Sequence, residues 1–174
     1  MRKALLATFA AIIVIGLGSW VVLRGRYTAL PPSPGEPRRA QEFILKDYEG
    51  REVKLSDFRG KVALVNAWAS WCPFCKEELK DFAAVKQELG DDVVIIAVDR
   101  AETLETAKRY SDALGTGEDI IFVLDPDDSF YQAIGGFSMP ETIFVDRDGL
   151  IRHHRRGPMQ KEEIRRRIED MLGL

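Results

Sequence analysis

Cysteine and histidine are scarce in this chain of 174 residues, which contains two of each. Small secreted folds that depend on disulfides usually have several pairs that close longer loops, and a structural zinc site needs four Cys or His ligands. Cys72 and Cys75 are three positions apart. His153 and His154 are adjacent, so their side chains would point to opposite faces of a strand. We therefore expect neither a disulfide scaffold nor a metal site.

Acidic residues are absent from residues 1–26, which carry four basic residues. The whole chain has a formal charge of -3, so removing these four positive charges leaves -7 for residues 27–174. An acidic domain repels the phosphate backbone of nucleic acids. We therefore expect no nucleic-acid partner.

Charge of either sign is missing from residues 4–23. A helix of about 20 residues rises about 30 Å, the thickness of the hydrocarbon core of a bilayer. The run ends in Trp20-Val21-Val22-Leu23-Arg24, without the small-residue site at which signal peptides are cleaved. We predict a retained membrane anchor over residues 1–26. Basic residues on both sides of the run leave its orientation undecided.

Large apolar residues are few in residues 27–41, which contain four prolines. This composition predicts a stiff, solvated tether, with the domain following at residues 42–174. Within the domain, apolar segments with strand character alternate with segments of helical periodicity. The expected strands are residues 42–46, 52–55, 61–68, 93–98, 120–124, 142–146 and 150–155, and the expected helices are residues 73–89, 102–114, 127–134 and 160–172. This order predicts an α/β fold with a sheet of mixed direction.

The two cysteines stand between the strand at 61–68 and the helix at 73–89. Cys72 would then lie at a helix N-terminus, where free N–H groups and the helix dipole stabilise a thiolate. Pro73 suits the first helical position because it has no N–H to satisfy. Cys72 could attack a disulfide, and Cys75, one turn further on, could resolve the mixed disulfide. A static disulfide and a pair of buried cysteines are the alternatives.

Glu78 lies three residues after Cys75 and therefore beside it on the helix surface. A carboxyl group partly desolvated near the thiols would have a raised pKa and could relay protons during exchange. Alternatively, Glu78 belongs to a solvated charged face together with residues such as Glu77 and Lys80. A second acidic group, Asp125 to Asp128, lacks the ligand spacing of a calcium loop and is predicted to cap a helix.

Several stretches of the domain form an ordered set. They are Phe43-Ile44-Leu45-Lys46-Asp47 with Gly50, then Leu55-Ser56-Asp57-Phe58-Arg59-Gly60-Lys61, then Leu64-Val65-Asn66-Ala67-Trp68-Ala69-Ser70-Trp71-Cys72-Pro73-Phe74-Cys75, and finally Pro140-Glu141-Thr142 with Val145-Asp146-Arg147-Asp148-Gly149. Together they resemble the thioredoxin superfamily, and specifically its membrane-anchored branch of the TlpA/ResA/CcmG type. The resemblance covers residues 42 to about 170.

The resemblance implies a thioredoxin-like mixed sheet flanked by helices, with an N-terminal β-hairpin extension and an inserted αβ unit, preceded by one transmembrane helix. It also implies that Pro140 is a cis-proline packed against the disulfide and that the backbone of Met139 faces the substrate. We further expect Trp71, Pro73 and Phe74 to contact the substrate.

Two positions depart from the pattern of the superfamily. Asn66 stands where thioredoxins proper have a buried Asp, and because Asn does not titrate, a proton relay would fall to Glu78. Lys80 stands where relatives often have a helix-kinking proline, so we expect a straighter helix here.

The resemblance implies a reductant on the extracytoplasmic side of a bacterial inner membrane, held there by one membrane pass. A transmembrane thiol reductase would supply electrons, and the substrates would be exported proteins with disulfides, such as apocytochrome c during cytochrome c maturation. The redox-active disulfide Cys72–Cys75 would need no cofactor. One alternative is a non-catalytic client-binding or chaperone module on the same scaffold. Another is a thiol peroxidase, but the Pro-x-x-x-Thr-x-x-Cys setting of its reactive cysteine is missing.

Overall fold

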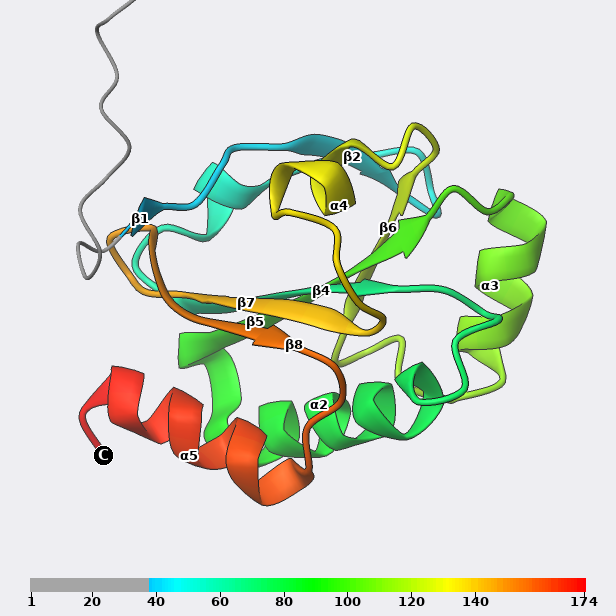
Figure 1. Cartoon of the computed structure of the whole chain (residues 1–174). Coiled ribbons are helices and arrows are strands. Elements are labelled where there is room, and N and C mark those ends of the chain that lie inside the picture. Colours follow the sequence, from blue (N-terminus) through cyan, green and yellow to red (C-terminus); the bar gives the residue numbers. More distant parts are fainter. Residues whose placement is uncertain (1–37) are drawn as a thin grey trace, which may run out of the picture. The chain divides into compact units, whose positions relative to one another are not determined.

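The computed structural model describes residues 38–174, which contain one mixed sheet and the helices packed on it (Figure 1). The predicted anchor, residues 1–26, and the predicted tether up to residue 37 lie outside the described residues. The strands are β1 (Arg38–Arg39), β2 (Ile44–Asp47), β3 (Glu52–Lys54), β4 (Val62–Trp68), β5 (Val93–Arg100), β6 (Ile121–Asp125), β7 (Glu141–Val145) and β8 (Leu150–Arg156). The α-helices are α2 (Cys75–Leu89), α3 (Leu104–Asp112), α4 (Ser129–Ala133) and α5 (Lys161–Leu172), and short 3-10 helices span Leu55–Phe58 and Gly90–Asp92.

The strand order is β1-β8-β7-β4-β5-β6-β2-β3. Strands β4, β5 and β6 run parallel, and the remaining neighbours pair antiparallel. All residues of β4 are buried, as expected for a central strand that is covered on both faces. The mixed direction predicted from the order of strands and helices is confirmed.

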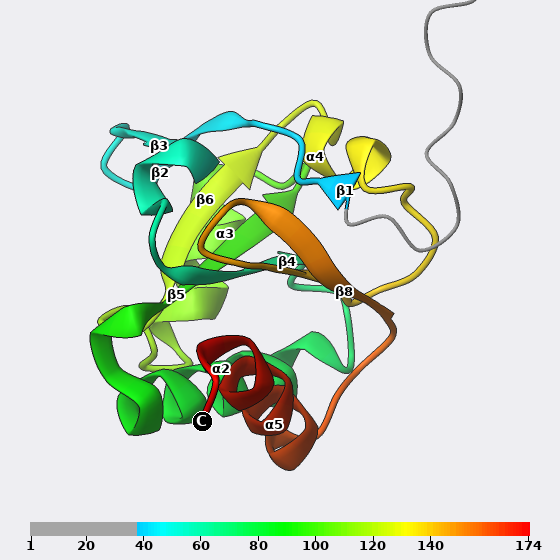
Figure 2. The same ribbon diagram turned by 90° about the vertical axis from the view of Figure 1, so that its left-hand side faces the viewer.

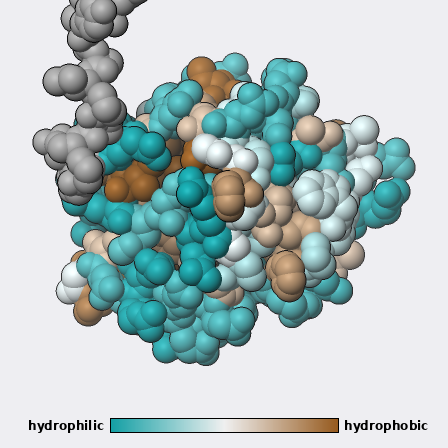
Figure 3. Space-filling view, viewed as in Figure 1, coloured by the Kyte–Doolittle hydropathy of each residue, from teal (hydrophilic) through white to brown (hydrophobic). Residues whose placement is uncertain are grey.

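Helices cover the sheet on two sides (Figures 1 and 2). Because side chains alternate along a strand, β4 contributes to two cores. Leu64 packs with Phe82 of α2 and Ile164 of α5, while Val65 packs on the other face with Phe130 of α4. The surface in Figure 3 is mostly hydrophilic, with small separate hydrophobic patches.

The hairpin predicted near the start of the domain is present as β2 and β3, which pair from Ile44 with Lys54 to Lys46 with Glu52. Its turn is stabilised by Asp47, whose carboxylate accepts hydrogen bonds from the N–H groups of Glu49 (3.0 Å) and Arg51 (2.8 Å). Strand β2 also pairs with β6, so the hairpin extends the sheet at one edge.

The fold begins earlier than the predicted boundary at residue 42. Arg38 and Arg39 form β1, which pairs with Ile151 and Leu150 of β8, and Ala40 is buried. The predicted tether therefore ends before residue 38, not at residue 41. The proline-rich composition concealed this strand, because its stability comes from backbone hydrogen bonds to a distant part of the chain.

The start of the active-site helix was predicted at Pro73, but α2 begins at Cys75. Residues 69–74 form a turn, in which the N–H of Cys75 donates to Cys72, with 3.4 Å to its carbonyl oxygen and 3.2 Å to its sulfur. Cys72 thus precedes the helix by three residues and does not occupy the position directly before its first turn. Assignments of helix ends commonly differ by one or two residues. Here the bonds from the N–H of Cys75 to Cys72 show that residues 72–75 form a turn ahead of the helix.

None of the helices within residues 38–174 combines the length and the apolar character that crossing a bilayer requires.

Candidate active site

Cys72 and Cys75 form a disulfide between the end of β4 and the start of α2. Both cysteines are buried, whereas the aromatic residues next to them, Trp71 and Phe74, are 61% and 58% exposed. The N–H of Cys75 points at the sulfur of Cys72, and such a donor stabilises a thiolate there after reduction. The arrangement favours Cys72 as the attacking sulfur.

Glu78 is buried on α2 with 2% of its surface exposed. Its carboxyl oxygens accept hydrogen bonds from the N–H of Met159 (2.9 Å) and from Nδ2 of Asn66 (3.2 Å). Burial raises the pKa of Glu78 to about 8, although both hydrogen bonds favour the ionised form. This is the predicted direction. The solvated face of the helix belongs to other residues, such as the exposed ion pair of Glu77 and Lys80.

Asn66 joins Glu78 to the neighbouring strand β7. Its Nδ2 also donates to Oγ1 of Thr142 at 2.8 Å, and the two residues are opposite each other in the β4–β7 register. The hydrogen-bond path from the active-site helix therefore ends on β7 at Thr142, two residues after Pro140. Asn66 is fully buried and does not titrate, which leaves Glu78 as the ionisable member of this path.

The Met139–Pro140 peptide bond is cis, as the resemblance implied. The carbonyl of Pro140 accepts a hydrogen bond from the N–H of Gly157 at 2.9 Å, which fixes the proline at the start of β7. Met139 is partly buried and packs against the core cluster that contains Cys72 and Cys75. The structure therefore places the proline segment beside the cysteine core. The substrate-binding roles of Trp71, Pro73, Phe74, Met139 and Pro140 stay predictions.

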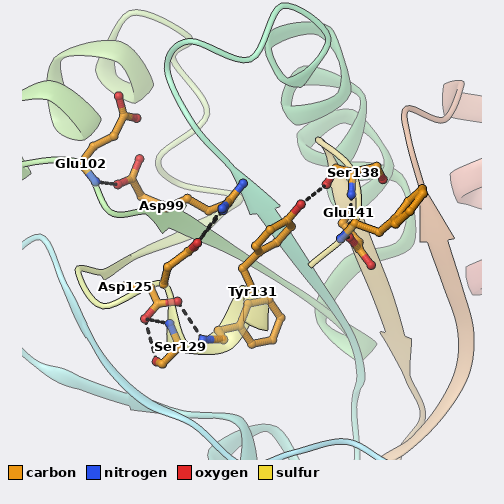
Figure 4. Close-up of polar contacts among 11 residues, drawn as sticks. Asp99, Glu102, Asp125, Ser129, Tyr131, Ser138 and Glu141 are labelled. Atoms are coloured by element: carbon orange, nitrogen blue, oxygen red, sulfur yellow. Dashed lines mark hydrogen bonds and ion pairs between the residues drawn. The ribbon is translucent and has the colours of Figure 1, made fainter. Parts of the chain in front are cut away.

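Glu141 directly follows the cis-proline, and no role was predicted for it. It is fully buried, and its Oε2 accepts hydrogen bonds from the N–H groups of Phe137 (2.8 Å) and Ser138 (3.1 Å). The carbonyl of Ser138 accepts a further bond from the hydroxyl of Tyr131 at 3.1 Å (Figure 4). These contacts hold the loop that leads into the cis-proline.

The other oxygen of Glu141 contacts two basic side chains of β8. Oε1 lies 2.6 Å from Nε2 of His154 and 3.3 Å from Nε of Arg156. Burial alone would raise the pKa of Glu141, but its hydrogen bonds outweigh burial and lower the pKa. An acidic residue in an otherwise apolar strand was the one signal in the sequence that could have drawn attention to this position.

A second group missed in the sequence lies next to the cysteine turn. The carboxylate of Glu102 accepts hydrogen bonds from the N–H (2.7 Å) and the hydroxyl (2.6 Å) of Ser70, which is two residues before Cys72. Glu102 in turn donates its own N–H to Oδ1 of the buried Asp99 at 3.1 Å (Figure 4). No local sequence pattern joins these residues, because Ser70 and Glu102 follow different strands.

Asp125 and the two histidines each contact other residues of the fold. Asp125 caps α4, as predicted, by accepting hydrogen bonds from the N–H groups of Ser129 and Phe130 (Figure 4). His153 packs edge-on against a phenylalanine, while His154 contacts Glu141. Within residues 38–174, no three His, Cys, Asp or Glu side chains are grouped so that they could hold a metal ion.

A disulfide between strand and helix, with a buried carboxyl group on the same helix and a cis-proline bond whose Met139 packs on the same core, can exchange electrons with other disulfides. The fold and this geometry define a thioredoxin-like protein of thiol–disulfide exchange. The sequence profile of the Redoxin family matches residues 35–172, and the chain belongs to this family.

Two relatives indicate which type of thiol–disulfide exchange protein this is. The thiol-disulfide oxidoreductase ResA of Geobacillus thermodenitrificans (strain NG80-2) is 32% identical over 135 residues, covering 76% of this chain and 75% of the relative. The thiol:disulfide interchange protein DsbE of Allochromatium vinosum is 33% identical over 148 residues, covering 82% and 78%. The protein is thus a thiol-disulfide oxidoreductase of the ResA/DsbE type.

One solved structure supports the fold. A putative thiol:disulfide interchange protein DsbE from Chlorobium tepidum superposes with a TM-score of 0.74, covering 81% of this chain and 100% of that one. The two sequences are 24% identical, so this likeness bears on the fold alone.

Proposed function

We propose that the protein is a membrane-anchored reductant that acts on disulfides of exported proteins on the extracytoplasmic side of a bacterial inner membrane. The uncharged run of residues 4–23 supports the anchor. The observation that carries the chemistry is the buried Cys72–Cys75 disulfide, each cysteine of which directly follows an exposed aromatic residue in the chain. Apocytochrome c is one client of this kind, and a transmembrane thiol reductase would restore the dithiol.

The reaction begins with the reduced protein. The Cys72 thiolate attacks one sulfur of the client disulfide, so that a bond from Cys72 to the client forms while the client S–S bond breaks and releases a thiolate. Cys75, once deprotonated, attacks Cys72 and forms the internal disulfide while the second client sulfur leaves. Two electrons and two protons pass from the protein to the client, whose two cysteines end as thiols.

Glu78 handles the proton of Cys75 in this scheme. The pKa of Glu78 is raised by burial to about 8, close to that of an ordinary thiol at about 8.5. A proton moves between groups of similar pKa at little cost near neutral pH. The bond from Asn66 holds the carboxyl group in place during the transfer.

Exposed aromatic residues offer a surface for the client. Trp71 directly precedes Cys72 and Phe74 directly precedes Cys75, and Phe137, at 79% exposed, lies in the loop before the cis-proline. Aromatic side chains contribute large apolar contact areas at low entropic cost, which suits the binding of unfolded or extended clients.

A trapping experiment in the full-length protein tests this function. Cys75→Ser cannot resolve the mixed disulfide, so clients should accumulate as covalent adducts through Cys72 that a reductant releases. The matched control, Cys72→Ser with Cys75 intact, should trap no client. If Cys75→Ser forms no adduct while its Cys72 still reacts with a small alkylating reagent, the proposed order of attack is wrong. The identity of the trapped proteins tests the assignment to exported clients.

A further inference from the structure

Two carboxyl groups, that of the buried Asp99 and that of the partly exposed Glu102, meet near the turn that carries Cys72. Asp99 is fully buried in β5, opposite Trp68 of β4 in the parallel register. Its side chain lies within hydrogen-bond reach of the Glu102 carboxylate. Two ionised carboxylates are both acceptors and repel each other, so this contact requires a proton on one of them. Figure 4 shows the two side chains at one end of the polar network.

The position of the proton follows from the partners of each group. Glu102 accepts two short hydrogen bonds from Ser70, which favour its ionised form. Asp99 accepts the N–H of Glu102 at one oxygen, while its Oδ2 is buried and has no donor among residues 38–174. A buried, unpaired carboxylate oxygen is costly, whereas a protonated one becomes a donor. The proton therefore belongs on Asp99, with Glu102 as its acceptor.

No cation compensates the pair. Within the part of the chain that the structure describes, no ion pair involves Asp99 or Glu102, and the nearby Arg100 is paired with Asp128. Trp68, whose ring nitrogen is buried without an acceptor in residues 38–174, is neutral. The titratable groups that act on the pair directly are Asp125 at the end of β6, Tyr48 in the hairpin turn and Tyr110 on α3. Further out, Lys108 and Asp112 of α3 lie near Tyr48, Glu77 and Lys80 of α2 lie near Tyr110, and Arg109 of α3 lines a pocket together with Ser70.

The two hydrogen bonds that Ser70 donates to Glu102, called the clamp below, connect the carboxyl pair to the turn that carries Cys72. Ser70 lies in the turn from β4 to α2, and in the same turn the N–H of Cys72 donates to the carbonyl of Ala69 at 3.1 Å. A carboxylate that holds both the N–H and the hydroxyl of Ser70 restricts the backbone two residues before the attacking sulfur. Anything that displaces Glu102 changes the position of Cys72.

We propose that Asp99 is a positioning residue: its proton binds Glu102, Glu102 holds Ser70, and loss of that proton in mildly alkaline solution loosens the turn that presents Cys72. The effect on reactivity rests on the proposed function, in which Cys72 is the attacking sulfur. Burial, together with the neighbouring Glu102, raises the pKa of Asp99 to about 8. Burial would also raise the pKa of Glu102, but the hydrogen bonds from Ser70 and Asp99 lower it. The pair thus holds one proton at neutral pH and releases it near pH 8.

The oxidised full-length protein provides the test, because its cysteines do not titrate. In the wild type, the amide resonance of Ser70 should shift in one transition near pH 8, and its protection from hydrogen exchange should fall about tenfold, as expected for one lost hydrogen bond. Asp99→Asn keeps a donor to Glu102 but cannot titrate, so its Ser70 signal should stay constant with pH. Asp112→Asn, on the surface of α3, is the matched control and should behave as the wild type does.

The rate of disulfide reduction provides a second test. The rate at which dithiothreitol thiolate reduces the Cys72–Cys75 disulfide should rise above pH 8 in the wild type, and this extra rise should be absent in Asp99→Asn. Glu102→Ala, which removes the clamp, should react fast at every pH. A wild-type Ser70 resonance without a transition, or a transition that persists in Asp99→Asn, would overturn the proposal even if one variant failed to fold. Neither measurement uses a physiological client, so its outcome is separate from the trapping result.

Discussion

Two buried glutamates on opposite sides of the active site carry different charges. Glu78 on α2 and Glu141 on β7 are 2% and 0% exposed. Glu78 accepts two hydrogen bonds from neutral donors, and its pKa is raised by burial to about 8. Burial also acts on Glu141, but two N–H groups and two basic side chains lower its pKa. Burial alone therefore does not decide the charge of a carboxyl group, because enough donors, some of them basic, can outweigh it.

The two charge states suit two roles. A carboxyl group that titrates near neutral pH can give and take the proton of a thiol, which is what the exchange at Cys75 requires. A permanently ionised carboxylate can hold backbone N–H groups in place, as Glu141 does for Phe137 and Ser138 before the cis-proline. In the proposed mechanism, the site therefore separates proton transfer on the helix from loop positioning on the strand.

The largest difference should be in stability at pH 7. Glu141→Gln removes a charge that pairs with His154 and Arg156, so we expect a loss of about 3 kcal/mol in the free energy of unfolding. Glu78→Gln resembles the protonated acid and should change stability by less than about 1 kcal/mol. Urea unfolding of the oxidised protein measures both, with the exposed Glu77→Gln as control. Equal losses for the two variants would refute the assigned charges.

The loss of activity should be larger for Glu78→Gln than for Glu141→Gln, which is the reverse of their order in stability. Glu78→Gln cannot transfer a proton, so we expect the rate of insulin reduction by the reduced protein to fall about a hundredfold at pH 7. Glu77→Gln, one residue earlier on the solvated face, should retain the wild-type rate. An unchanged rate in Glu78→Gln would mean that solvent, and not this carboxyl group, exchanges protons with Cys75.

The pH dependence of stability should separate the two groups by sign. The folded-state pKa of Glu78 is raised, so between about pH 4.5 and 8 the folded state binds more protons than the unfolded state, and stability falls as the pH rises. Each such group contributes a slope of at most about 1.4 kcal/mol per pH unit, and Glu78→Gln should remove one slope. The pKa of Glu141 is lowered, so its contribution is present above its unfolded pKa of about 4.3 and is lost as the pH falls below it. Urea unfolding from pH 3 to 9 would contradict this if Glu78→Gln left the neutral slope unchanged.

Glu78 was accessible from the sequence because its argument is local. Its distance of three residues from Cys75 along a helix fixes their adjacency, and burial then sets the direction of the pKa. The fully buried strand β4 was predictable for a similar reason, since all of its residues except Asn66 are apolar. Both inferences use one element of secondary structure at a time.

Glu141 and Glu102 were missed because their partners come from other elements. His154 and Arg156 reach Glu141 through the antiparallel register of β7 and β8. Ser70 reaches Glu102 only because β4 and β5 run parallel and end side by side. Strand β1 was missed for the same reason, as its partner is more than 100 residues away. Register between distant strands is not encoded in local spacing, so these contacts required the structure.

The smallest effect should come from Arg156, the outermost partner of Glu141. Its side chain is 52% exposed, and its guanidinium carbon lies 5.4 Å from the ring centre of Phe137. Because solvent screens a half-exposed ion pair, Arg156→Gln should cost at most about 1 kcal/mol in urea unfolding. A double-mutant cycle with Glu141→Gln should give a coupling of about 0.5 kcal/mol. A coupling of 2 kcal/mol or more would show that Arg156, and not the buried N–H groups with His154, keeps Glu141 ionised. Zero coupling would assign the charge of Glu141 to those inner donors alone, and would leave Arg156 to orient Phe137 toward the client.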